Sequence, residues 1–291
     1  IKSKITPRTK AIVIINPNNP TGAVYPKEIL EQIADIAREN ELIIFSDEIY
    51  DRLVMDGYKH TSIASLAPDV FCVTFAGFRI GWMILSGAKS KAKGYIEGIN
   101  MLSSMRLCSN VPAQSIVQTA LGGYQSVNEY TQPGGRVYEQ RDFIYKALND
   151  IPGISVVKPH AAFYIFPKID TEKFNIFNDE QFALDFLHEK QVLVVPGKGF
   201  NWNQPDHFRI VYLPDIRQLD KAMKKMKEFF ATYKHPRQCG GLSGGRVVPH
   251  VHRTGGMPLR GRDQLQGLSV GLRHSHGGPH QRQAPARFAL T

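Results

Sequence analysis

The sequence predicts an α/β protein, in which the strands of a mostly parallel sheet alternate with helices. Apolar runs typical of buried parallel strands occur at residues 11–15, 42–45 and 70–75. Between the first two runs, apolar residues recur at helical spacing from Pro26 to Arg38. Polar residues follow the first two runs directly, and open α/β sheets bind their ligands at the carboxyl ends of strands. These observations favour a ligand-binding α/β domain.

The elements that follow suggest a division into domains. Residues 81–85 are expected to pair beside the strand at 70–75, and residues 89–150 have helical character, with Pro112 near one helix start and Gly122 near its end. After Pro152 the chain predicts short strands at 154–159, 161–169, 192–197 and 207–213, with helices at 179–190 and 216–233. We therefore predict part of a large domain over residues 1–127, a connecting helix over 128–150 and a smaller C-terminal α+β domain over 151–235.

Composition narrows the class of protein. A chain of 291 residues with 42% apolar content can bury one or two cores. No apolar run approaches the roughly 18 residues that a membrane span needs, so a cytoplasmic protein without a membrane partner is expected. Its three cysteines, Cys72, Cys108 and Cys239, lack CxxC spacing, which argues against a disulfide framework and against a zinc site.

The last 56 residues, 236–291, which we call the tail, differ from the rest. Eight Arg and one Asp give the tail +7 of the total net charge of +10. Eleven Gly and five Pro without periodicity predict disorder. Two alternatives are adventitious metal binding by its five histidines and nucleic-acid binding by its arginines. The absence of interleaved aromatic residues and the nearly balanced charge of residues 1–235 argue against nucleic acid.

Two motifs at strand ends carry a family resemblance. Residues 16–22 read NPNNPTG, and residues 46–50 read SDEIY. Together they resemble the signature of the class I/II aminotransferases, which use pyridoxal 5'-phosphate (PLP). The resemblance implies that Asp47 pairs with the protonated pyridine nitrogen and that Tyr50 and Asn19 contact the phenolic oxygen of PLP. A solvated acid and a plain turn are the alternatives for these residues.

Two arginines extend the resemblance. Arg79, in GFRIGW, corresponds to the arginine that grips the cofactor phosphate, where a planar guanidinium suits a dianion. Arg209, in HFRIVY, corresponds to the arginine that binds the substrate α-carboxylate. An exposed surface arginine is the alternative for either.

The resemblance is interrupted where the family carries its catalytic lysine. In this family a Ser-Lys pair precedes the phosphate-binding arginine, and that lysine forms the Schiff base with PLP. Here Phe75 runs directly into Ala76, and residues 60–88 contain no lysine. We therefore name no catalytic residue, and we expect a chain that begins within the large domain and lacks the lysine loop. General acid-base assistance alone is typically worth about 10²- to 10⁴-fold in rate.

The sequence is most similar, within this family, to bacterial alanine (glutamate-pyruvate) aminotransferases, on the runs SMRLCSNVPAQ and PGKGFNWNQPDHFRIVYLP. This resemblance implies transfer of an amino group between alanine or glutamate and a 2-oxo acid such as pyruvate or 2-oxoglutarate, in a homodimer. The alternative is a catalytically inactive fragment of such an enzyme. We take the first as the family identity and the second as the expected behaviour of this chain.

Overall fold

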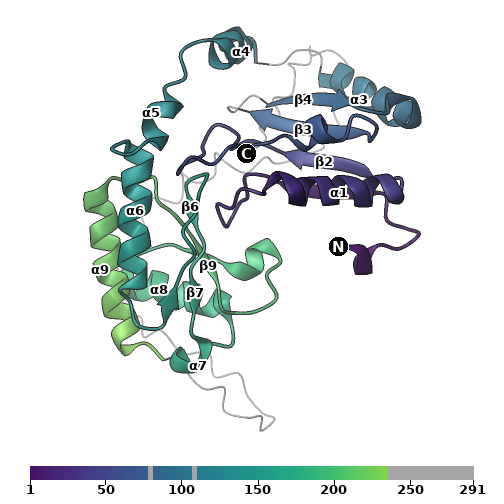
Figure 1. Cartoon of the computed structure of the whole chain (residues 1–291). Coiled ribbons are helices and arrows are strands. Elements are labelled where there is room, and N and C mark those ends of the chain that lie inside the picture. Colours follow the sequence, from purple (N-terminus) through teal and green to yellow (C-terminus); the bar gives the residue numbers. More distant parts are fainter. Residues whose placement is uncertain (78–80, 107–109, 235–291) are drawn as a thin grey trace, which may run out of the picture. The chain divides into compact units, whose positions relative to one another are not determined.

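The computed structural model describes residues 1–77, 81–106 and 110–234 (Figure 1). Its strands are β1 (Ala11–Ile15), β2 (Ile43–Asp47), β3 (Cys72–Gly77), β4 (Gly81–Ser86), β5 (Ile154–Ser155), β6 (Tyr164–Ile165), β7 (Lys168–Ile169), β8 (Val195–Pro196) and β9 (Phe208–Val211). Its α-helices are α1 (Lys27–Glu39), α2 (Ile63–Leu66), α3 (Lys93–Arg106), α4 (Val111–Gly122), α5 (Val127–Thr131), α6 (Arg136–Asn149), α7 (Thr171–Phe174), α8 (Asp179–Lys190) and α9 (Ile216–Thr232). Short 3₁₀ turns occur at η1 (Lys2–Lys4), η2 (Lys89–Ala92) and η3 (Gly197–Phe200).

The first four strands form one mostly parallel sheet, as predicted. Its order is β1-β2-β3-β4, with β1, β2 and β3 parallel and β4 antiparallel to β3. The expected pairing of residues 81–85 beside β3 is therefore confirmed. Strand β3 continues without interruption through Phe75 and Ala76, which pair with Met83 and Trp82 of β4. The carboxyl ends of the three parallel strands share one edge of the sheet.

Helix α1 covers one face of this sheet and positions its strands (Figure 1). Pro26 precedes its first turn, where the missing N–H of proline costs no hydrogen bond. The face that α1 buries includes Leu30, Ile33 and Ala37, which pack with Ile44 of β2. The amphipathic spacing read from the sequence thus produces the strand, helix, strand unit that carries the first two motifs.

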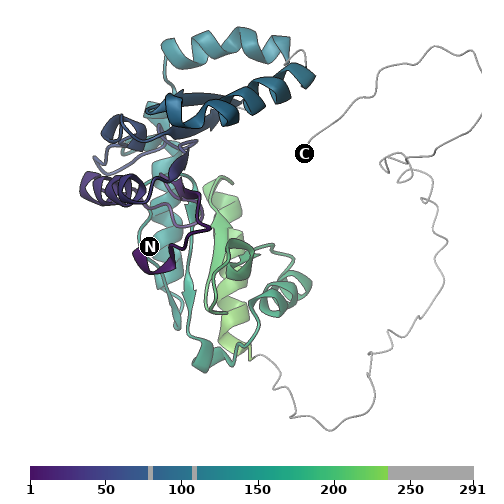
Figure 2. The ribbon, with the colours of Figure 1, turned by 90° about the vertical axis from the view of Figure 1, so that its right-hand side faces the viewer.

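The predicted single helix over 128–150 is wrong. The structure has α5 and α6 instead, separated by Gln132–Gly135. The reason is local: Pro133 disfavours helical backbone in the residue before it, and Gly134 has a φ of +85°. Helix α6 then begins at Arg136 and packs beside α9 (Figures 1 and 2).

The C-terminal strands are shorter than predicted, although the helices agree closely. Residues 154–159 and 161–169 yield only the two-residue strands β5, β6 and β7, and β8 also has two residues. They form a sheet β6-β9-β8 and a separate pair β5-β7. Helices α6, α8 and α9 supply the surrounding core, whose largest buried side chains include Phe182, Phe186 and Phe229. Side-chain packing, more than strand pairing, holds this region together.

Three further expectations from the sequence concern membrane spans, cysteines and metal-binding groups. No helix among the described residues is long and apolar enough to cross a membrane. Cys72 is buried with a free thiol. No metal-binding group of His, Cys, Asp and Glu occurs among those residues. Cys108, Cys239 and the tail lie outside the described residues, so the expectations about them stay predictions.

Candidate active site

The loop after β1 is fixed by its own polar groups. The Asn18 carbonyl accepts a hydrogen bond from Gly22 N at 2.9 Å, and the Asn18 side-chain oxygen accepts one from Thr21 Oγ1 at 2.8 Å. Asn16 Oδ1 accepts from the amide of Tyr25 at 2.9 Å, which ties the loop to the approach of α1. This network holds Asn19 at the carboxyl edge of the sheet.

The second motif stands beside the first because β1 and β2 are parallel and in register. Ile15 pairs with Asp47, and the amide of Asn16 donates to the Asp47 carbonyl at 3.0 Å. Asp47 is the last residue of β2, and its Oδ1 accepts from the amide of Ile49 at 3.2 Å. Asp47 forms no ion pair with any residue that the structure describes.

Arg209 comes from β9 and reaches the same place. Its Nη1 donates to Asn19 Oδ1 at 2.9 Å. Its guanidinium carbon lies 4.5 Å from the ring centroid of Tyr164 and 4.7 Å from that of Phe200. These contacts hold the cation between two aromatic faces, which attract it electrostatically.

The guanidinium of Arg209 also has an unsatisfied donor. Its Nε is buried and has no hydrogen-bond partner, and no carboxylate of the described residues pairs with Arg209. A buried donor without an acceptor typically costs about 1–3 kcal/mol, so such a group in a native protein needs an explanation. An anionic ligand would supply the acceptor.

Tyr50 interacts electrostatically with both charged residues of this site, Asp47 and Arg209. Its hydroxyl is 2.9 Å from the hydroxyl of Tyr164. Burial raises the pKa of Tyr50 well above its usual range; the hydrogen bond to Tyr164 and the negative charge of Asp47 act in the same direction, whereas Arg209 acts against them. The phenol therefore stays protonated at neutral pH and can donate a hydrogen bond.

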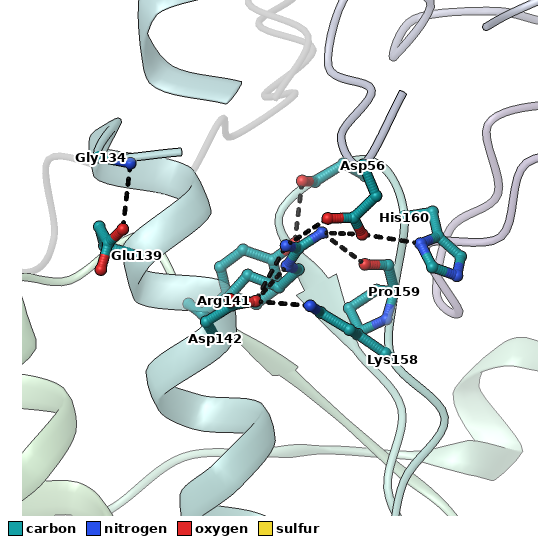
Figure 3. A network of polar contacts seen from close by, with 10 residues as sticks. Asp56, Gly134, Glu139, Arg141, Asp142, Lys158, Pro159 and His160 are labelled. Atoms are coloured by element: carbon teal, nitrogen blue, oxygen red, sulfur yellow. Dashed lines mark hydrogen bonds and ion pairs between the residues drawn. The ribbon is translucent and has the colours of Figure 1, made fainter. Parts of the chain in front are cut away.

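A partly buried ion pair anchors the segment that follows Tyr50 (Figure 3). The Arg141 guanidinium of α6 binds both carboxylate oxygens of Asp56, at 2.6 and 2.9 Å, and the side chain of Arg141 is 0% exposed. In Figure 3 the Asp56 carboxylate lies between Arg141 and the His160 imidazole, whose Nδ1 is 2.9 Å away. Asp142 and the carbonyl of Pro159 complete the surroundings of Arg141.

The segment that leads into β6, which includes His160, contacts the loop after β1. The amides of His160 and Ala161 both donate to the Gly22 carbonyl, at 3.0 and 2.9 Å. Gly22 has a φ of +69°, and a Cβ there would lie 2.4 Å from Pro159 Cβ. Only glycine fits, because the conformation is left-handed and the space is filled. The loop that carries Asn19 is thereby fixed against the segment that leads into β6.

Four of the five predicted binding residues can be placed. Asn19 contacts Arg209, and Tyr50 interacts electrostatically with both Asp47 and Arg209, so these four lie together. Arg79 lies outside the described residues, and its predicted phosphate contact stays a prediction. Strand β3 runs without interruption from Cys72 to Gly77.

Two residues of the site, Tyr164 and Phe200, have no counterpart among the predictions. Tyr164 is 114 positions from Tyr50, so no local motif links them. The link between Tyr164 and Arg209 appears only in the strand pairing of the folded chain. Tyr164 pairs with Val211, and Arg209 lies two residues from Val211 on the same face, which makes Tyr164 and Arg209 diagonal neighbours.

Comparison with known proteins supports the assignment of these motifs. Residues 1–226 match the family model "Aminotransferase class I and II". The glutamate-pyruvate aminotransferase AlaA of Haemophilus influenzae is 59% identical over 243 residues, which are 80% of this chain and 60% of that protein. This chain thus spans about 60% of the length of that curated relative.

Solved structures give the same result. An aminotransferase from Escherichia coli has a TM-score of 0.79 and 55% identity, over 81% of this chain and 60% of that one. An alanine aminotransferase from Pyrococcus furiosus has a TM-score of 0.74 and 44% identity, over 79% and 60% of the two chains. The expected similarity to alanine aminotransferases is confirmed. With its two strand-end motifs and Arg209 assembled in one site, this chain belongs to the class I and II aminotransferase family.

Proposed function

We propose that this site takes PLP together with an amino acid or 2-oxo acid, as in an alanine (glutamate-pyruvate) aminotransferase. The observation that carries the proposal is the guanidinium of Arg209, whose Nη1 is engaged by Asn19 while its buried Nε has no partner. A planar guanidinium fits a carboxylate in a bidentate manner. The α-carboxylate shared by alanine, glutamate, pyruvate and 2-oxoglutarate is therefore the ligand group that we assign to Arg209.

The residues beside Arg209 suit the ring of the cofactor. Asp47 has no cationic partner among the described residues, and a protonated pyridine nitrogen would provide one. Tyr50 is a protonated phenol and can donate to an oxygen of the ring. Asn19 gives its carbonyl oxygen to Arg209, which leaves its amide NH₂ as a donor for a ligand. When bound, PLP supplies the electron sink that amino-group transfer requires.

A specific observation favours a second candidate, in which this chain binds its ligands without turnover. Residues 60–88 contain no lysine, and β3 passes through Phe75 and Ala76 without a loop. The chain then has no amine in the place where the family positions its base. We assign transamination to the family and binding without turnover to this chain. Homodimer formation, which the resemblance implies, and a cytoplasmic location, which the composition led us to expect, remain predictions.

Titration of the 291-residue chain with 2-oxoglutarate, followed by calorimetry, tests the carboxylate assignment. We expect Arg209→Lys to weaken binding at least about tenfold, because lysine offers a point charge in place of a bidentate fork. Arg217→Lys, on the exposed surface of α9, is the matched control and should bind like the parent chain. Equal weakening in both variants, or no binding by the parent chain, contradicts the proposal.

A further inference from the structure

Tyr164 contacts two side chains of the candidate site, Tyr50 and Arg209. Its hydroxyl is 2.9 Å from the hydroxyl of Tyr50, the phenol assigned to the cofactor ring. Its ring lies beneath the guanidinium of Arg209, with 4.5 Å between the guanidinium carbon and the ring centroid. Tyr164 thus links the hydroxyl of Tyr50 to the guanidinium of Arg209 by direct contacts.

The position of Tyr164 is fixed independently of these contacts. Its backbone pairs with Val211 in the β6-β9 ladder, and its carbonyl lies 3.3 Å from where a Cβ of Gly22 would stand. The ring of Tyr50 meets that of Tyr164 edge to face at 5.7 Å, an arrangement that aromatic pairs prefer. Tyr164 is thus held by the sheet, and it can orient the two side chains that touch it.

We propose that Tyr164 is a positioning residue with two separable tasks: its hydroxyl orients the phenol of Tyr50, and its ring orients the guanidinium of Arg209. The relevance of this role to catalysis in the family rests on the proposed function. The contacts themselves do not depend on that function. In the structure the hydroxyl of Tyr164 contacts Tyr50, and its ring contacts Arg209, so a different part of the side chain performs each task.

Two variants separate these tasks. Tyr164→Phe removes the hydroxyl and keeps the ring, whereas Tyr164→Leu removes both. Tyr233→Phe is the matched control, because it deletes a hydroxyl that hydrogen-bonds Asp185 at 2.9 Å and touches neither Tyr50 nor Arg209. Circular dichroism and thermal unfolding of the 291-residue chain show whether each variant keeps its fold.

Nuclear magnetic resonance provides readouts that loss of stability alone does not move. The ¹³Cζ shift of Tyr50 reports the hydrogen bonding of its hydroxyl, and the side-chain ¹⁵Nε signal of Arg209 reports the ring beneath it. We expect Tyr164→Phe to shift the Tyr50 signal and to leave the Arg209 signal in place. Tyr164→Leu should shift both signals, and Tyr233→Phe should shift neither.

Binding of 2-oxoglutarate then tests the consequence for the ligand. Loss of the cation–π contact in Tyr164→Leu should weaken binding by up to about tenfold, and Tyr164→Phe should bind within about twofold of the parent chain. An unmoved Tyr50 signal in Tyr164→Phe, or an unmoved Arg209 signal in Tyr164→Leu, overturns the inference. If the signals move as expected but the parent chain binds no 2-oxoglutarate, the proposed function fails and the positioning role stands.

Discussion

Arg209 donates a hydrogen bond from Nη1 to Oδ1 of Asn19 at 2.9 Å, across 190 positions of sequence. This bond joins the loop after β1 to β9 and thereby connects the amide that we propose faces the cofactor with the guanidinium that we propose binds the carboxylate. Asparagine is suited to this place because its amide accepts on one side and donates on the other. Neither an aspartate nor an alanine could do both.

Replacing Asn19 tests this connection. In Asn19→Asp, the introduced carboxylate would pair with Arg209 and compete with the ligand, so we expect 2-oxoglutarate binding to fall about tenfold or more. Asn19→Ala removes the acceptor without adding a charge and should weaken 2-oxoglutarate binding less than Asn19→Asp does. Calorimetric titration of both variants measures the difference. An Asn19→Asp variant that binds as tightly as Asn19→Ala would show that Arg209 does not receive the carboxylate.

Gly22 is expected to tolerate no side chain. In Gly22→Ala, a Cβ would meet Pro159 at 2.4 Å and the Ala161 carbonyl at 2.8 Å, in a backbone with a φ of +69°. Gly57 provides the control, because its φ of +75° is similar but a Cβ placed there would have no neighbouring atom within 4 Å. Gly57→Ala should cost about 1–2 kcal/mol from the left-handed backbone alone. Gly22→Ala should cost about 1–3 kcal/mol more, because its Cβ has no space. Equal free energies of unfolding in urea for the two variants would contradict this steric effect.

Arg141 is expected to be the most costly charged residue to remove. Arg141→Met leaves Asp56 without the guanidinium that pairs with it; breaking a fully buried pair typically costs about 3–5 kcal/mol, and we expect a smaller loss here because the Asp56 side chain is 20% exposed. Arg38 pairs with Asp35 and Asp69 on the surface, where solvent screens the charges and such pairs contribute little, so Arg38→Met is the control. Urea unfolding compares the two variants. Adding Asp56→Asn to Arg141→Met should recover part of the loss, and no recovery would argue against the pair.

The Asp56 pair should also make stability depend on pH. Burial alone would raise the pKa of Asp56, but hydrogen bonds from Arg141 and His160 outweigh it and lower the pKa from 3.8 to about 2. A carboxyl whose pKa is lower in the folded state stabilises the fold above its unfolded pKa. That contribution is well below the roughly 2 kcal/mol of a fully buried pair, because solvent screens the partly exposed carboxyl, and it is lost as the pH falls from about 4 toward about 2.

Comparison of the parent chain with Asp56→Asn at different pH values measures this effect. The difference in their free energies of unfolding should be full at about pH 5 and smaller at about pH 3. The pKa of Asp69 is also lowered to about 2, by its hydrogen bonds to Arg38, but this pair is exposed and added salt should weaken its effect. A pH-independent difference for Asp56→Asn would contradict the assigned pair.

The motifs of the site were predictable because they are local. Asp47 ends one strand and Asn19 follows another, the apolar run of each strand is readable, and parallel pairing then brings the strand ends together. Helix α1 and helix α8 also follow from spacing and caps in their own sequences: the side chain of Asn178, for example, accepts from the amides of Glu180 and Gln181 at the start of α8.

The contacts between distant segments were not predictable. The two-residue strands β5 to β8 are too short for their residue pattern to define their ends. Helix α6 begins after a break at Pro133 and Gly134, which the spacing of apolar residues alone does not predict. The partner of Arg141 is Asp56, 85 positions away, and nothing near either residue indicates the other. Such pairs depend on how the elements pack.

Mixing the purified chain with PLP, before and after borohydride, tests the central claim most directly. We expect PLP to bind, with an absorbance unlike that of a lysine adduct, and borohydride to fix it stoichiometrically to no single lysine peptide, because residues 60–88 contain no lysine. Asp47→Asn should weaken that binding by removing the partner of the pyridine nitrogen. Borohydride fixation of PLP to one lysine peptide, or a chain that binds no PLP, would contradict an aminotransferase site that binds its cofactor without the lysine.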